Sequence, residues 1–433
     1  MKIAIMTLGT RGDLQPFVAL ALGLKNAGYD VLLISSKNDE EFVKSFGLAY
    51  YALNVDIQKM MEEQEMQEMT KGDNPIKFFR SHLSGSRKLK KMMVAIQEEV
   101  WQACLDADAI IYHPGMPNGY FIAKELKIPS LMASPFPVSA TKAYPSILFY
   151  NGPRLGKLYN LATHFIFERA FWFLSRSALK AFWENKAKPK VVTRVPPTKL
   201  QVSSGMPVIY GYSEELFPKP KDWEANVEVT GNWILESEPN WTPPADLVDF
   251  IESGVPPVYV GFGSIKDLST FRETIGTVLE ALALAKQRAV IALGWNRLPA
   301  NDALPSTVFL LESAPHSWLF PRMAAVVHHG GAGTTAAGLH AGKPTVIIPH
   351  SADQPAWGRR VYELGVGPQP VFRKNLSAEK LANAIKSALD QKVIAQASKL
   401  GKKLKAENGV GKAVSIVNNY LRHHNPGPLP TSE

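Results

Sequence analysis

Residues 2–35 read KIAIMTLGTRGDLQPFVALALGLKNAGYDVLLIS, and their pattern predicts the architecture of the first half of the chain. The apolar run at 2–9 predicts a buried strand that ends in a glycine-containing turn. Apolar positions at helical spacing then predict a helix over 14–27, and a second apolar run at 29–35 predicts another strand. A strand, a helix and a strand in this order form a βαβ unit, so we expect a parallel sheet.

Further short apolar runs continue this alternation as far as residue 348. In the first half they predict strands at 109–112, 130–133 and 208–210. In the second half they predict strands at 258–262, 289–293, 308–311, 325–328 and 345–348, with helical patterns between them. The predicted class is therefore α/β, with two doubly wound, Rossmann-like domains facing an interdomain cleft at the carboxyl ends of their strands.

The length of 433 residues also favours two domains. The composition becomes rich in proline and acid around residues 239–257. We accordingly expect an N-terminal acceptor-binding domain at 1–235, a linker at 236–256, a C-terminal nucleotide-sugar-binding domain at 257–405, and a C-terminal helix and tail at 406–433.

Composition indicates a folded, cytoplasmic protein. Hydrophobic residues make up 45% and charged residues 20% of the chain. The single cysteine, Cys104, cannot form an internal disulfide, which fits a reducing compartment. The first apolar run is too short for a secretory signal, and no stretch approaches the ~18 apolar residues that would span a bilayer.

The formal net charge of +9 permits attraction to phosphates or to an anionic membrane surface. The densest basic cluster, at 87–91, lacks a nucleic-acid-binding module, so we expect no nucleic acid partner. Residues 145–188 combine many aromatic side chains with basic ones. One interpretation is an amphipathic surface that contacts a membrane or binds a hydrophobic acceptor. The other is a helix whose aromatic residues face the core and whose basic residues face outward. Both interpretations can hold at once.

The strongest local signal is the run HHGGAGTT at 328–335, which follows a predicted strand and precedes a helical pattern. Small residues let the backbone approach a ligand, and free N–H groups at a helix start suit a diphosphate. His329 adds a side-chain donor. The run is neither the dinucleotide fingerprint nor a Walker A loop, and tight packing explains many such turns.

Two groups of polar residues follow other predicted strands. Asp353 and Gln354 can hydrogen-bond vicinal sugar hydroxyls, or they form a turn or a helix cap. Asp13 can accept a proton from an attacking hydroxyl, or it is the N-cap of the helix predicted from Leu14. If Asp13 is only a cap, His113 is the next candidate for the base.

Two further candidates lie in the second half of the chain. The backbone of Gly263 and Ser264, at the end of a strand, can meet a diphosphate. Trp295 has a ring suited either to stacking near a nucleotide base or to core packing.

Together these stretches resemble the sterol glucosyltransferase branch of the family 1 glycosyltransferases. The resemblance lies in residues 9–20 (GTRGDLQPFVAL), in the run from 315–321 (PHSWLFP) to 365–368 (GVGP), and in 210–213 and 229–233. It implies a GT-B fold, inversion at the anomeric carbon and no bound metal. Bacterial enzymes that decorate glycopeptide and macrolide antibiotics share the first turn, so this turn does not identify the acceptor.

The resemblance also implies roles for individual residues. Asp13 corresponds to the catalytic base. The implied donor contacts are pyrophosphate contacts at Gly263 and Ser264, a diphosphate cradle at His329, Gly331, Ala332, Gly333 and Thr334, and sugar-hydroxyl contacts at Asp353 and Gln354. We add Gly9, Thr10, Arg11, Gly12, Trp295, Ala314 and His316 to the donor-binding set. Plant secondary-metabolite enzymes of the same family differ here: they have a catalytic histidine at the position of Asp13, a ribose-binding glutamate at that of Ala337, and a base-stacking tryptophan at that of Ser313.

The predicted function is transfer of glucose, with inversion, from UDP-glucose to a hydroxyl of a hydrophobic acceptor such as a sterol. The donor is a substrate, and no cofactor is expected. A polyketide, macrolide, flavonoid or glycolipid acceptor is the alternative within enzymes. The alternative outside enzymes is a non-catalytic protein that binds lipid or sugar nucleotide on the same fold.

Overall fold

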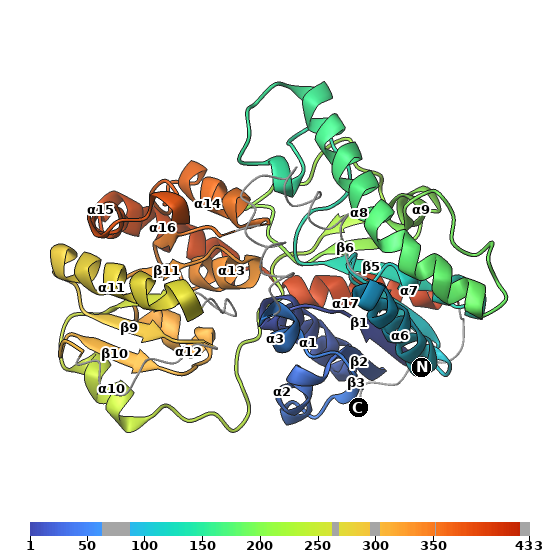
Figure 1. Ribbon diagram of the computed structural model, residues 1–433, viewed down its shortest axis with the longest axis horizontal. Helices are drawn as coiled ribbons and strands as arrows, with labels where there is room; N and C mark the ends of the chain where they lie inside the picture. Colours follow the sequence, from blue (N-terminus) through green and yellow to red (C-terminus); the bar gives the residue numbers. More distant parts are fainter. Residues whose placement is uncertain (63–86, 262–267, 295–303, 351, 425–433) are drawn as a thin grey trace. The chain divides into compact units, whose positions relative to one another are not determined.

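The structure is a computed structural model that describes residues 1–62, 87–261, 268–294, 304–350 and 352–424 (Figure 1). The chain divides into two compact units. The first comprises Met1–Ile57, Asn74–Leu235 and Glu407–Glu433, and the second comprises Gln58–Asp73 and Glu236–Ala406. Within the part of the chain described, no helix combines the length and apolarity needed to cross a bilayer.

The first unit is built on a parallel sheet of seven strands in the order β3-β2-β1-β4-β5-β6-β7. The strands are β1 Lys2–Met6, β2 Asp30–Ser36, β3 Ala49–Leu53, β4 Ala109–Tyr112, β5 Ser130–Ser134, β6 Val208–Tyr210 and β7 Val227–Val229. The central strands are buried over their whole length, as in a sheet covered on both faces. The predicted parallel sheet is confirmed, and only the two edge strands, β3 and β7, were not predicted.

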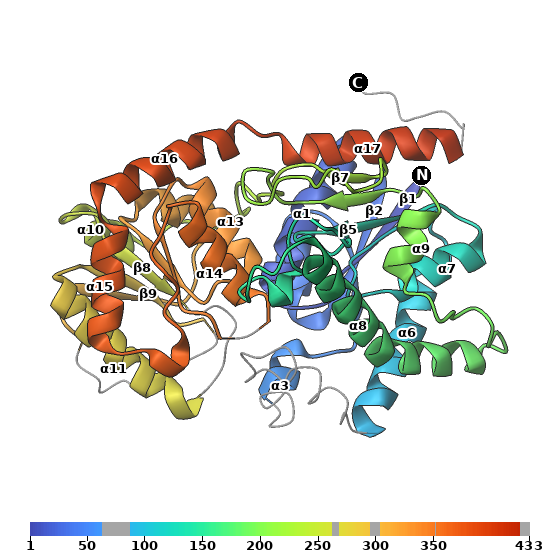
Figure 2. The same ribbon diagram turned by 90° about the horizontal axis from the view of Figure 1, so that it is seen from above.

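Helices cover both faces of this sheet. They are α1 Arg11–Asn26, α2 Glu40–Ser45, α6 Arg87–Cys104, α7 Asn118–Leu126, α8 Lys157–Asn185, α9 Pro197–Ser203 and α17 Gly409–His424, with the short helices η1 Lys37–Asp39 and η2 Ile147–Phe149. Helix α3 Ile57–Glu62 begins at the boundary between the units, because Gln58 and the residues after it belong to the second unit. The last helix, α17, packs on α1 and joins the core beneath it (Figure 2). Gly23 permits this approach, because a Cβ there would lie 2.4 Å from Val410.

Helix α8 runs along α6 and contains most of the aromatic segment predicted at 145–188 (Figure 1). Trp172, Phe182 and Trp183 are buried, whereas Phe165 and Phe173 are 57% and 69% exposed. The segment therefore divides between core residues and an exposed apolar surface.

The second unit has a parallel sheet of five strands in the order β10-β9-β8-β11-β12. The strands are β8 Val258–Gly261, β9 Ala289–Ala292, β10 Val308–Leu311, β11 Val326–His328 and β12 Thr345–Ile347. All five predicted strands are present, with ends that differ by one residue at most. The expectation of two α/β units with parallel sheets is confirmed.

The helices of the second unit are α10 Ala245–Glu252, α11 Leu268–Ala285, α12 His316–Leu319, α13 Ala332–His340, α14 Gln354–Glu363, α15 Ala378–Ala388 and α16 Gln391–Lys405, with η3 Phe320–Arg322 and η4 Arg373–Asn375. One core layer lies between the sheet, α11 and α15, and another between the sheet, α10 and α12. Helix α10 lies within residues 236–256, which we expected to be a linker, and its Leu247 is fully buried.

The strand orders define a switch point in each sheet. In the first unit the order reverses between β1 and β4, and in the second between β8 and β11. Connections that leave two neighbouring strands in opposite directions open a crevice at their carboxyl ends, where ligands bind in such sheets. The segments that follow these four strands are therefore the places to look for function.

Candidate active site

Asp13 lies in the first turn of α1, directly after β1. Helix α1 begins at Arg11 rather than at Leu14, because Thr10 and Asp13 form a capping box. The Asp13 Oδ2 atom accepts hydrogen bonds from the Thr10 backbone N–H (2.9 Å) and hydroxyl (3.2 Å). The interpretation of Asp13 as the N-cap is therefore wrong: Thr10 is the N-cap, and Asp13 is the third helical residue.

The rest of the first turn packs around this carboxylate. A Cβ at Gly9 would lie 2.3 Å from Asp13 Oδ2, so glycine leaves room for the carboxylate. The Arg11 guanidinium lies 4.1 Å from the centre of the Phe42 ring. Burial raises the pKa of Asp39, and the charge of Arg11 partly offsets this shift. Arg11 thus has partners within the first unit, while Gly12 is exposed.

The surroundings of Asp13 make it a better base than an exposed carboxylate. The side chain is half-buried, and burial raises its pKa above the ordinary value of 3.8. The hydrogen bonds from Thr10 oppose this shift, and the nearby Asp39 carboxylate adds to it. A raised pKa increases the affinity of the carboxylate for the proton of an attacking hydroxyl.

These opposing contributions predict opposite shifts in the pH dependence of transfer. If Asp13 is the base, activity falls as pH falls through its pKa, so the acid limb of kcat/KM lies above the usual aspartate range. Thr10→Val removes a hydrogen bond that lowers this pKa and should move the limb to higher pH. Asp39→Asn removes a charge that raises it and should move the limb to lower pH. If the acid limb moved in the same direction in both variants, or in neither, Asp13 would not be the titrating group.

His113 follows β4, the strand beside β1 at the switch point. Its Nδ1 accepts a hydrogen bond from the Gly115 N–H (3.0 Å), so the neutral ring carries its proton on Nε2. Burial lowers the pKa of His113 to about 4, and Nε2 is buried with no hydrogen-bond partner among the described residues. The ring lies edge-on to Phe17 and Phe136, with centroids at 5.8 and 5.7 Å.

Phe17 is four residues after Asp13 on α1, so the two side chains share a helix face. Asp13 and His113 therefore follow the two strands that meet at the switch point, and the low pKa of His113 makes its ring neutral at physiological pH. The sequence offered a signal for this position, because His113 directly follows a buried apolar strand.

The glycine-rich turn follows β11 in the second unit. The His328 Nδ1 accepts a hydrogen bond from the Gly330 N–H (3.0 Å), and Gly330 has a φ of +92°, which favours glycine. Helix α13 begins at Ala332, and its first internal backbone bond runs from the Thr335 N–H to the Gly331 carbonyl (2.9 Å). The N–H groups of Ala332, Gly333 and Thr334 precede this bond, and a helix start leaves such groups available to an anion.

Two histidines lie beside this turn. His329 is half-buried, and burial lowers its pKa to about 4, so it is neutral at physiological pH. A Cβ at Gly331 would lie 2.6 Å from its Nε2 atom. His316, at the start of α12, stacks on Phe320 with ring centroids 4.2 Å apart. Burial lowers the pKa of His328, and His329 and His316 add to this shift. A donor-binding role for His316 stays a prediction.

Asp353 and Gln354 follow β12. The Asp353 Oδ2 atom accepts a hydrogen bond from Trp357 Nε1–H (2.7 Å), and Gln354 Oε1 accepts one from the His350 N–H (2.7 Å). A Cβ at Gly330 would lie 3.1 Å from the Gln354 carbonyl, so Gln354 packs against the glycine-rich turn. These bonds fix the orientation of both side chains.

Each strand of the second sheet leads at its carboxyl end to a predicted donor residue. Those after β10, β11 and β12 are described: Ala314 and His316, the turn at 329–334, and Asp353 with Gln354. Gly263 and Ser264, after β8, and Trp295, after β9, lie outside the described residues. The turn after β11 stands at the switch point, where a nucleotide is expected.

Comparison with known proteins agrees with this arrangement. Residues 3–145 match the glycosyltransferase family 28 N-terminal domain, and residues 276–413 match the erythromycin biosynthesis protein CIII-like C-terminal domain. The sterol 3-beta-glucosyltransferase UGT80B1 of Arabidopsis thaliana is 34% identical over 445 residues, which cover 100% of this chain and 70% of that protein. The chain belongs to the sterol 3-beta-glucosyltransferase family.

Other members of the sterol 3-beta-glucosyltransferase family differ in length. UGT80A2 of Arabidopsis thaliana is 37% identical over 427 residues, covering 97% of this chain and 66% of that protein. The Aspergillus fumigatus protein is 32% identical over 440 residues, covering 98% of this chain and 30% of that protein. The chain thus spans about two thirds of the plant relatives and less than a third of this fungal one.

Solved structures establish the fold. The glycotransferase of kitacinnamycin has a TM-score of 0.69 at 19% identity, over 97% of this chain and 99% of that one. VinC, solved in complex with DTDP, has a TM-score of 0.67 at 17% identity, over 98% of this chain and 100% of that one. These similarities confirm the predicted GT-B fold for the family member described here.

Proposed function

We propose that this protein transfers glucose from UDP-glucose to a hydroxyl group of a sterol, with inversion at the anomeric carbon. The observation that carries the proposal is the position of Asp13 and of the glycine-rich turn. Each follows a strand at the switch point of its own sheet, in a chain that is 34–37% identical over nearly its whole length to plant sterol 3-beta-glucosyltransferases.

The reaction is a single displacement. The acceptor oxygen attacks the anomeric carbon as its proton passes to the Asp13 carboxylate, and the bond from that carbon to the diphosphate oxygen breaks. The electron pair leaves with UDP. General-base assistance of this kind typically contributes about 10²–10⁴-fold. His113, neutral and with no partner for its Nε2–H among the described residues, is assigned to orienting the acceptor hydroxyl.

The second unit supplies the donor contacts in this proposal. N–H groups of Ala332, Gly333 and Thr334 stabilise the charge that grows on the leaving diphosphate. Because the pKa of His329 is about 4, its ring binds the phosphate as a neutral hydrogen-bond donor. Asp353 and Gln354 hold the glucose hydroxyls. No cofactor enters this reaction scheme.

The proposal is tested by incubating the protein with several sugar nucleotides and with a sterol, a flavonoid and a macrolide, and by reading the products by mass. We expect a hexose added to the sterol, with UDP-glucose as the preferred donor. Transfer to the macrolide or flavonoid alone would retain the glycosyltransferase assignment and reject the sterol. Absence of transfer and of donor turnover would favour a non-catalytic binding protein.

We further propose peripheral contact between the α8 region and anionic membranes, from which a sterol is extracted. Exposed apolar side chains gather before and along α8: Leu155, Leu158, Leu161, Phe165, Ile166 and Phe173. Residues 142–199 contain 11 Lys or Arg and two Asp or Glu, so this segment alone accounts for the whole net charge of +9. An apolar surface surrounded by positive charge suits the interface of an anionic bilayer.

Vesicle co-sedimentation checks this contact. We expect binding to anionic vesicles at low salt that weakens as salt rises, because the attraction is screened. The double variant Phe165→Gln with Phe173→Gln should lose most of the binding and keep its fold, since both rings are exposed. Leu284→Gln with Tyr362→Gln, two exposed apolar residues of the second unit, is the matched control. Equal binding by both double variants would reject α8 as the contact.

A further inference from the structure

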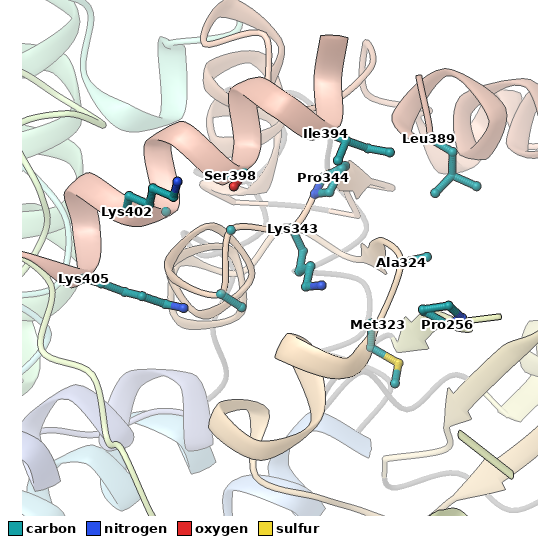
Figure 3. Close-up of a pocket in the computed structure, with 13 residues that line it drawn as sticks. Pro256, Met323, Ala324, Lys343, Pro344, Leu389, Ile394, Ser398, Lys402 and Lys405 are labelled. Carbon is teal, nitrogen blue, oxygen red and sulfur yellow. The ribbon is translucent and has the colours of Figure 1, made fainter. Parts of the chain in front are cut away.

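A cavity lies in the second unit, and none of the predicted donor residues lines it. It has a volume of about 430 Å³ and is lined by Pro256, Met323, Ala324, Ala341, Gly342, Lys343, Pro344, Leu389, Ile394, Ser398, Gly401, Lys402 and Lys405 (Figure 3). Cavities of this size hold small organic molecules. Pro256, Ala324 and Pro344 precede β8, β11 and β12, so the cavity opens at the amino ends of the strands. The donor residues follow the carboxyl ends of the same strands.

Three lysines line this cavity, and no acidic residue does. Among the described residues, no ion-pair partner is found for Lys343, Lys402 or Lys405. Lys343 is half-buried, and its pKa is lowered first by burial and then by the charge of Lys405. The three positive charges thus repel one another around one space.

Helix dipoles do not remove this excess of charge. Lys402 and Lys405 lie in the last turn of α16, and Lys343 follows the end of α13, where the carbonyl ends of helices attract cations. A helix terminus carries only about half an elementary charge. The arrangement therefore leaves most of three full charges to be balanced by an anion.

The cavity also has an apolar side. In Figure 3, Lys402 and Lys405 lie on one side, Met323, Pro256 and Leu389 on the other, and Lys343 between them. An occupant that matches both sides carries a compact negative group joined to a less polar portion. A phosphate monoester has this chemistry, and its dianion accepts several hydrogen bonds from lysine ammonium groups.

We propose that this cavity is a second ligand site, which binds the phosphate monoester of a small molecule or of a lipid headgroup through Lys343, Lys402 and Lys405. The site is independent of the donor residues, because it lies at the opposite edge of the sheet. Its assignment does not depend on the transfer reaction.

Calorimetric titration of the full chain tests the proposal, with saturating UDP present so that phosphate cannot enter the diphosphate turn. The probes are inorganic phosphate, glycerol 3-phosphate, and phosphatidylcholine vesicles with and without phosphatidic acid. The vesicles are used with the Phe165→Gln with Phe173→Gln protein and with cavity variants made in that background, so that α8 does not contribute to the binding. Saturable binding of glycerol 3-phosphate indicates a soluble ligand, and binding only to vesicles with phosphatidic acid indicates a lipid. Either result supports the site if the Kd rises at least about tenfold in Lys343→Gln with Lys405→Gln.

The matched control is Lys392→Gln with Lys399→Gln, which removes the same charge from α16 at positions that do not line the cavity. Its Kd should stay close to that of the parent protein. If Lys343→Gln lowers the thermal midpoint, Lys402→Gln with Lys405→Gln repeats the test with two exposed residues. The proposal would be overturned if none of the probes bound. It would also be overturned if the control pair, Lys392→Gln with Lys399→Gln, weakened binding as much as the cavity pair.

Discussion

Glucose transfer should fall by about 10²–10⁴-fold when Asp13 is replaced by asparagine, because the amide cannot take the acceptor's proton. This loss corresponds to about 3–5 kcal/mol of activation free energy. The asparagine Oδ1 atom can still accept the hydrogen bond of the Thr10 N–H, so the free energy of unfolding should change by less than about 1 kcal/mol. UDP affinity should also survive, since the diphosphate contacts are assigned to the second unit.

Turnover, thermal midpoint and UDP affinity are measured on the same preparation of Asp13→Asn. Asp39→Asn is the matched control, because it removes a neighbouring half-buried carboxylate without removing the proposed base. It should keep transfer within a few-fold of the parent at the pH optimum. If Asp13→Asn transferred sugar at close to the parent rate, the carboxylate would serve only the capping box.

For Asp13, the sequence predicted the position of the residue but not its structural role at the start of the helix. The pattern placed an acid between a strand and a helix, and the resemblance to a family gave it a chemical role. Sequence alone left the helix start open, because Thr10 and Asp13 are both good residues for a helix N-terminus. Only the geometry, with Gly9 leaving room and Thr10 donating twice to the carboxylate, decides that Thr10 is the cap.

The strands of both sheets were predictable because parallel strands buried on both faces appear as short apolar runs. The two missed strands are the edges of the first sheet. In β3, residues Ala49–Leu53, only the last residue is buried, and in β7, residues Val227–Val229, the polar Glu228 interrupts the apolar run. Neither strand is the continuous buried apolar run by which the other strands were predicted.

The order of the strands in each sheet could not be predicted from the sequence patterns, and the site depends on it. A single sequence does not state which strands are neighbours, so it could not place His113 beside Asp13. The sheet order β2-β1-β4 does so, because it puts both residues at the reversal point. The glycine-rich turn after β11 also lies at a reversal point, that of the second sheet. This position favours a ligand-binding role for the turn over a role in packing alone.

The proposed function makes its second large prediction at this turn. Ala332→Pro should lower glucose transfer by about 10²–10³-fold, because it deletes one backbone N–H aimed at the leaving diphosphate. The helix itself should tolerate the change. Ala332 is the first residue of α13, where proline is favoured, and Gly331 before it is extended (φ −61°, ψ 144°), as a residue before proline prefers.

Ala245→Pro is the control that separates loss of the N–H from the general effect of proline. Ala245 is the exposed first residue of α10 in the same unit, it also follows an extended residue, Pro244, and it lies outside the proposed donor contacts. Both variants should keep the thermal midpoint of the parent, while only Ala332→Pro should lose transfer and bind UDP more weakly. If Ala332→Pro retained parent-like UDP affinity and turnover, the diphosphate would have to be held elsewhere, and the helix start after β11 would be a packing feature.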